Sequence, residues 1–118
     1  QIIVLREKNG DRQLPIVIGF LEASSIKMKL SGVEPPRPMT HDLLVATFQG
    51  LEAVLDRLII DKMVNNTFHA KLEFKTKDGT IKLIDARPTD AVALAVRTDA
   101  FIFLEEDVLR KAAITKIE

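Results

Sequence analysis

The chain has 118 residues, 47% of them hydrophobic, which is typical of one globular domain, and it has no cysteine, which excludes disulfides, thiolate nucleophiles and cysteine-based zinc sites. Seventeen basic residues balance seventeen acidic ones, so no global field favours nucleic acid or an anionic membrane. No apolar run approaches the roughly 20 residues that span a bilayer and no signal-peptide pattern is present, so we expect a soluble, cytoplasmic protein without a membrane partner.

The first third of the chain predicts a β-hairpin, a helix and a stiff connection. β-Branched runs at Ile2–Arg6 and 14–18 flank the pair Asn9-Gly10, which favours a tight hairpin turn. Apolar residues then recur at helical spacing from Phe20 to Leu30, and a Ser-Gly pair ends this helix. Three prolines in the following segment forbid a helix and favour an extended connection.

A second helix is expected to begin at Thr40 and to continue toward Arg57. Thr40 is the expected N-cap, and Asp42 complements the positive end of the helix dipole. Gly50 inside this helix suggests a close approach by a neighbouring element. The helical spacing is carried by four apolar residues, Leu44, Phe48, Leu51 and Leu55.

The second half of the chain predicts strands with two further helices. Residues 67–77 alternate between apolar and polar, and after the Asp78-Gly79 turn we expect Ile81 and Leu83 to face inward. The elements expected here are strands at 58–64, 67–77, 80–85 and Phe101–Leu104 and helices at Pro88–Thr98 and 105–112. Together they predict an α+β fold, a single domain with a largely antiparallel sheet built from hairpins and about four helices packed on it.

The helix at Pro88–Thr98 is apolar on all sides of its central part, residues 91–96. Such a helix is either buried within its own domain or covered by another subunit. Because a chain of this size can bury a helix completely only with difficulty, we expect a homo-oligomer, most simply a dimer. Its interface would contain this helix or the short strand at Phe101–Leu104.

Three charged residues, Asp85, Arg87 and Asp90, lie where the last hairpin strand meets this apolar helix. Counting by twos from Leu83 places Asp85 and Arg87 on the inward side of the strand. One interpretation is a structural ion pair that fixes the turn, with Asp90 complementing the helix dipole. The other is a functional site, because arginine beside carboxylates binds phosphate while the carboxylates hold a hard cation. Sequence spacing does not choose between them.

A second polar cluster lies at the start of the helix expected near Thr40. His41 is able to act as a general acid or base near neutral pH, and a helix N-terminus attracts anions. The alternative is ordinary capping, with a solvated His41 beside a capping Thr40 and a dipole-complementing Asp42. Glu22, early in the first helix, has the same two interpretations.

Common catalytic motifs are absent, because the sequence contains no Walker or Rossmann glycine loop, no His-Glu-x-x-His spacing and no Gly-x-Ser-x-Gly elbow. Residues 14–44, 65–74 and 84–103 nevertheless closely resemble the bifunctional nuclease domain family. The most specific parts are Pro-Arg-Pro-x-Thr-His-Asp at 36–42 and Asp-x-Arg-Pro-Thr-Asp-Ala at 85–91. The resemblance covers nearly all of residues 1–118, and it implies one further strand before Gln1.

The resemblance implies a nuclease that hydrolyses phosphodiester bonds of RNA and DNA. Metal-assisted hydrolysis needs carboxylates to hold Mg²⁺ or Mn²⁺, a cation to offset the phosphate charge, and a group that activates water. The expected catalytic residues are His41, Asp42, Asp85, Arg87 and Asp90; the expected metal ligands are Asp42, Asp85, Asp90 and Glu22; the expected substrate contacts are Arg37, Lys27 and Lys29. All of this requires the two helix N-termini to converge in space.

A competing hypothesis is a non-catalytic oligomeric regulatory or scaffold module, in which the same charges only fix the turns. The neutral net charge and the absence of tryptophan and tyrosine as stacking platforms favour this hypothesis. The sequence leaves both functions open.

Overall fold

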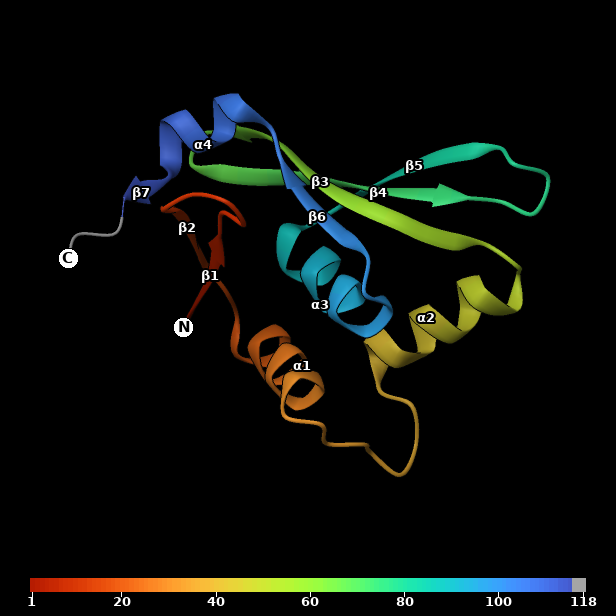
Figure 1. Ribbon diagram of the computed structural model, residues 1–118. Helices are drawn as coiled ribbons and strands as arrows, with labels where there is room; N and C mark the ends of the chain where they lie inside the picture. The colour runs from red at the N-terminus through yellow and green to blue at the C-terminus, as the bar shows by residue number, and fades with distance from the viewer. Residues whose placement is uncertain (116–118) are drawn as a thin grey trace.

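Figure 1 shows the computed structural model of the chain, in which residues 1–115 are described. The described part contains four helices and seven strands, and the predicted α+β class is confirmed. In chain order the elements are β1 (Ile2–Arg6), β2 (Arg12–Val17), α1 (Phe20–Leu30), α2 (Thr40–Gly50), β3 (Val54–Val64), β4 (Thr67–Lys75), β5 (Ile81–Ala86), α3 (Pro88–Thr98), β6 (Phe101–Leu104), α4 (Glu106–Ala112) and β7 (Ile114–Thr115).

The strands form two sheets where the sequence predicted one. The larger sheet has the order β5-β4-β3-β6, and its pairs are antiparallel except for β3 and β6, which run parallel. The smaller sheet has the order β1-β2-β7 and is antiparallel. The parallel pair arises because α3 carries the chain back along the larger sheet between β5 and β6. The two-residue strand β7 was not predicted.

Helix α3 lies at the centre of the molecule, below the larger sheet and beside α1 and α2 (Figure 1). Seven of its residues are buried, including Pro88, Thr89 and the run from Ala91 to Ala95. Of the two alternatives for this helix, burial within its own domain and cover by another subunit, the structure shows the first, because α1, α2, β3 and β4 enclose it within one chain. None of the helices in residues 1–115 is long and apolar enough to cross a membrane.

Helix α2 is shorter than predicted. It ends at Gly50, and Glu52 adopts a left-handed backbone conformation with φ of 62° that turns the chain into β3. Leu55, predicted as helical, is a buried residue of β3, because pairing with β4 outweighs the helical spacing of the apolar residues. The predicted close approach at Gly50 is also wrong, since no neighbouring element of the described residues lies within 4 Å of the position that a side chain would occupy there.

The inward face of β5 is the opposite of the one predicted. Ile81 and Leu83 are 50% and 58% exposed. Ile84 lies opposite the buried Leu72 of β4, and directly opposed residues of antiparallel strands share a face. Asp85 lies opposite Lys71, on the other face. The prediction failed because β5 is an edge strand with exposed residues on both faces. Its alternation of apolar and polar residues therefore does not indicate which face is buried.

Candidate functional site

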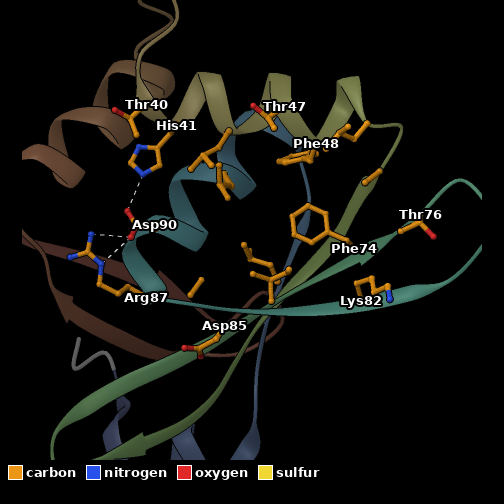
Figure 2. Close-up of a pocket in the computed structure, with 17 residues that line it drawn as sticks. Thr40, His41, Thr47, Phe48, Phe74, Thr76, Lys82, Asp85, Arg87 and Asp90 are labelled. Atoms are coloured by element: carbon orange, nitrogen blue, oxygen red, sulfur yellow. Dashed lines mark hydrogen bonds and ion pairs between the residues drawn. The ribbon is translucent and has the colours of Figure 1, made fainter.

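The N-termini of α2 and α3 meet at a hydrogen bond between His41 and Asp90. The His41 Nε2 atom lies 2.9 Å from Asp90 Oδ1, and Arg87 Nε donates to Asp90 Oδ2 at 2.9 Å (Figure 2). Arg87 Nη2 also donates to Glu22 Oε1 of α1 at 2.9 Å. The structure therefore brings together four of the residues singled out from the sequence: Glu22, His41 and Asp90 from α1, α2 and α3, and Arg87 from the N-cap of α3.

The other ring nitrogen of His41 binds a residue that the sequence did not indicate. His41 Nδ1 lies 2.7 Å from Ser25 Oγ, which also accepts a hydrogen bond from Arg97 Nη2 at 3.0 Å. An ionised carboxylate only accepts, so Nε2 carries the proton toward Asp90, and in the neutral ring Nδ1 accepts from Ser25. Arg97 lies seven residues after Asp90, a spacing that places both on one face of α3. This seven-residue spacing is the feature of the sequence from which Arg97 could have been predicted.

Asp42 connects the start of α2 to the same buried network. The N-cap of α2 is Met39 and not Thr40, and its backbone N–H donates to Asp42 Oδ2 at 2.9 Å. Arg97 Nε donates to Asp42 Oδ1 at 2.7 Å, and the Arg97 side chain is only 5% exposed. Asp42 thus caps its own helix and neutralises a buried guanidinium.

Asp85 does not join this cluster, so the expectation that it would lie with Arg87 and Asp90 is wrong. Its carboxylate accepts a hydrogen bond from Lys71 Nζ at 3.1 Å, and Lys71 also lies 3.6 Å from Asp61. Figure 2 shows Asp85 on the other side of the β5 ribbon from Arg87 and Asp90. The strand register decides this, because Asp85 is paired directly with Lys71 of β4. Its catalytic and metal-binding roles stay predictions.

The ion pairs lower the pKa values of their carboxylates. The hydrogen bond from Arg97, aided by the Met39 N–H, lowers the pKa of Asp42. Burial raises the pKa of Asp90, but hydrogen bonds from His41 and Arg87 outweigh it, so this pKa is also lowered. Asp90, followed by Glu22, raises the pKa of the Arg87 guanidinium. Asp42 and Asp90 are therefore ionised at neutral pH, and Arg87 stays charged.

An apolar groove of about 900 Å³ opens beside the cluster, between α2 and the β4–β5 hairpin. His41, Arg87 and Asp90 line one end of it, and Thr76 and Lys82 line the other (Figure 2). Its apolar wall includes Leu44 and Phe48 of α2, Leu72 and Phe74 of β4 and Ile84 of β5. A volume of this size is typical of ligand-binding clefts.

The expected substrate contacts Lys27, Lys29 and Arg37 are exposed, and none of them lines the groove. No group of three His, Cys, Asp or Glu residues arranged to hold a metal ion occurs within residues 1–115. Each expected ligand is instead paired with a cation: Asp42 with Arg97, Asp85 with Lys71, and both Glu22 and Asp90 with Arg87. This arrangement does not fit a bound divalent ion.

Comparison with known proteins agrees with the sequence motifs. Two proteins of Mycobacterium tuberculosis, uncharacterized protein Rv1829 and uncharacterized protein MT1877, are each 45% identical to the chain over 113 residues. The matched region is 96% of this chain and 66% of each relative, so the chain spans somewhat less than two thirds of their length. The family model of the bifunctional nuclease domain matches residues 3–116, and the chain therefore belongs to the bifunctional nuclease domain family.

Proposed function

We propose that the domain hydrolyses phosphodiester bonds in RNA and DNA at the cluster formed by His41, Arg87 and Asp90. The observation that carries this proposal is the meeting of two helix N-termini at the 2.9 Å contact between His41 and Asp90, beside an open groove. Helix N-termini favour anions, and a guanidinium next to a carboxylate combines phosphate binding with proton transfer. Membership of the nuclease family supports the same reaction.

Each residue of the cluster has a distinct part in the proposed reaction. The Arg87 side chain is 67% exposed, and among the described contacts its Nη1 atom is unused, so this atom is available to a phosphate oxygen. Asp90, which its lowered pKa keeps ionised, accepts a proton from the water as the water oxygen bonds to phosphorus; the bond from phosphorus to the leaving sugar oxygen breaks, and that oxygen takes a proton from solvent. His41 is a positioning residue that holds Asp90 through Nε2 while Ser25 holds the ring through Nδ1.

The expectation of Mg²⁺ or Mn²⁺ stays a prediction. A cation bound between Glu22 and Asp90 would first have to displace Arg87, which both carboxylates now bind. The proposed steps therefore use only side chains of the protein. Cleavage measured in chelator tests this prediction: its loss would support a carboxylate-held metal, and its persistence would support steps that use side chains alone.

The test compares wild type with Asp90→Asn and Asp99→Asn on labelled RNA and DNA. Asp99 lies at the opposite end of α3 in a left-handed conformation with φ of 57°, which asparagine tolerates well, so it is a matched control. We expect Asp90→Asn to slow cleavage by about 100-fold or more, as loss of a general base does, and Asp99→Asn to change it less than about twofold. Equal residual activity in all three proteins would contradict the proposal and indicate a contaminating nuclease.

A non-catalytic scaffold module is the second candidate. It is favoured because most polar atoms of the cluster already have hydrogen-bond partners. Both ring nitrogens of His41 and both oxygens of Asp90 already have partners within the chain. In this case neither wild type nor Asp90→Asn would cleave nucleic acid, and the substitution would alter only stability. The cleavage comparison above therefore separates the two candidates.

We also propose that the domain is a homo-oligomer of the cytoplasm. With α3 enclosed, the candidate interface that remains from the sequence is edge strand β6, where Phe101 and Phe103 are 67% and 45% exposed. Exposed aromatic side chains on an unpaired edge favour pairing with a second strand. Sedimentation of the purified domain at tens of micromolar tests this, and a monomeric mass would contradict it.

A further inference from the structure

The two ends of the groove differ in chemistry from its centre. One end carries Arg87, with His41 and Asp90 behind it, and the other carries Lys82 and the Thr76 hydroxyl (Figure 2). Between them the groove is apolar, and its aromatic pair, Phe48 and Phe74, packs edge to face with ring centroids 5.0 Å apart. An occupant must therefore combine an apolar, planar middle part with anionic groups at both ends.

The end near Lys82 is cationic. Of the three lysines among residues 75–82 of the β4–β5 hairpin, Lys82 lines the groove, whereas Lys75 pairs with Ile81 on the other face of the hairpin. The Asp78 carboxylate is occupied by hydrogen bonds from the Thr76 hydroxyl and the Thr80 backbone N–H. Lys77 pairs with Glu52, whereas no ion pair of Lys82 is found among residues 1–115. Lys82 is thus available to an anion that enters the groove.

We propose that this groove binds the unpaired bases of a single nucleic-acid strand, whose phosphates contact Lys82 at one end and Arg87 at the other. This inference rests on the proposed function and assigns its substrate class. Five positions along an extended strand span about 16 Å, the length of a few nucleotides. Bases offer planar apolar faces to aromatic and aliphatic walls, and their phosphates supply the anionic groups.

Selectivity for single strands follows from the same geometry. In a duplex the bases are stacked and paired, so each base must be extruded, at a cost of a few kcal/mol, before it meets an apolar wall. The Leu44 and Ile84 side chains, which line the groove from α2 and β5, meet only bases that are already unpaired. The proposal therefore predicts tighter binding of single strands than of duplexes of equal length.

The test measures fluorescence anisotropy of a labelled oligothymidylate, of an abasic strand with the same phosphates, and of a duplex, in chelator. The variants are Ile84→Glu, which places a negative charge in the groove, and Leu83→Glu, its neighbour on the opposite face of β5 with similar exposure. We expect the oligothymidylate to bind roughly tenfold more tightly than the abasic strand, and Ile84→Glu alone to abolish this difference. Lys82→Gln should reduce the slope of log affinity against log salt concentration by about one unit, because one phosphate contact is lost.

Five outcomes decide the inference. Equal binding of the abasic and normal strands, or equal losses in Ile84→Glu and Leu83→Glu, would overturn it while leaving cleavage at Asp90 intact. If Ile84→Glu changes the sedimentation mass and not the base preference, the groove is a subunit interface and the inference is wrong. Base-dependent binding that needs Ile84, in a protein that cleaves nothing, would support the groove and contradict the proposed nuclease. The same binding with cleavage supports both.

Discussion

Two charged clusters lie on opposite sides of the larger sheet and differ in burial. At the helix junction, Arg97 and His41 are almost completely buried and bridge Asp42, Ser25 and Asp90. On the outer face of the sheet, Lys71 pairs with Asp61 and with Asp85, whose side chain is 74% exposed. Arg97 is only 5% exposed, whereas the carboxylates of Asp61, Asp42 and Asp90 are alike at 28%, 29% and 31%. Water therefore screens the pair of Lys71 with Asp85 and not the Arg97 guanidinium.

This difference shows what each cluster contributes to the molecule. Removing one partner of a buried pair leaves a desolvated charge, whereas an exposed pair exchanges its partner for water. The helix junction therefore holds α1, α2 and α3 in one arrangement, whereas the pair between Lys71 and the exposed Asp85 contributes little to stability. The predictions below test this contrast, from the largest expected effect to the smallest.

The largest effect is expected for Asp42→Ala. It leaves the buried Arg97 guanidinium without its carboxylate and α2 without its cap, and we expect the free energy of unfolding to fall by about 3 kcal/mol or more. Urea denaturation measures this directly. A loss below about 1 kcal/mol would mean that Ser25 and Ala93 alone satisfy Arg97, and the contrast would fail.

A smaller loss is expected for His41→Leu. The variant removes the hydrogen bonds to Ser25 and Asp90 but preserves apolar volume, so we expect a loss of about 1 to 3 kcal/mol. His69→Leu, a partly buried histidine of β4, is the matched control. Equal losses in the two variants, measured by thermal unfolding, would show that the network adds nothing specific.

Acid is expected to weaken the helix junction. The pKa values of Asp42 and Asp90 are lowered in the folded state, so the stability they contribute is present above the unfolded pKa of about 3.9. This contribution is lost as the pH falls through the folded values. Below about pH 4, the free energy of unfolding of wild type should therefore fall more steeply with pH than that of Asp42→Asn. Because the pair with Arg97 is largely buried, 1 M NaCl should change this difference in steepness little. Parallel pH curves for the two proteins would contradict the prediction.

The smallest effect is expected for Asp85→Asn. Lys71 lowers the pKa of Asp85, but this carboxylate is well exposed, so water screens the pair. We expect a loss of stability smaller than that of His41→Leu at low salt and none at 1 M NaCl. A large loss of stability would place Asp85 among the buried pairs. Loss of cleavage without loss of stability would restore its predicted catalytic role.

Most elements could be predicted from local pattern. The bounds of α1, α3, β1 and β6 agree with the structure, because helical spacing, a turn pair or a proline marks each of them. The end of α2 could not be predicted, since Leu51 and Leu55 continue the helical spacing. Pairing of β3 with β4 makes the chain extended from Val54 onward, and that pairing is not local.

The candidate site was predicted in part. His41, Asp90 and Arg87 were named from motifs, but His41 and Asp90 are 49 positions apart, and only packing of α2 against α3 brings them together. Ser25 was missed because a serine inside a helix, here one of the adjacent pair Ser24-Ser25, belongs to no recognised motif. Asp85 was placed on the wrong face because an edge strand with both faces exposed has no hydrophobic phase.

The sequence by itself determined the α+β class, the family, most strands and helices, and the residues that carry charge next to helix N-termini, because these follow from local periodicity and from motifs. Only the tertiary structure decided which charges meet, which of them are buried, and where a groove opens. Those properties depend on how α2, α3 and β5 pack, and packing is determined by the free energy of the whole fold rather than by any single segment.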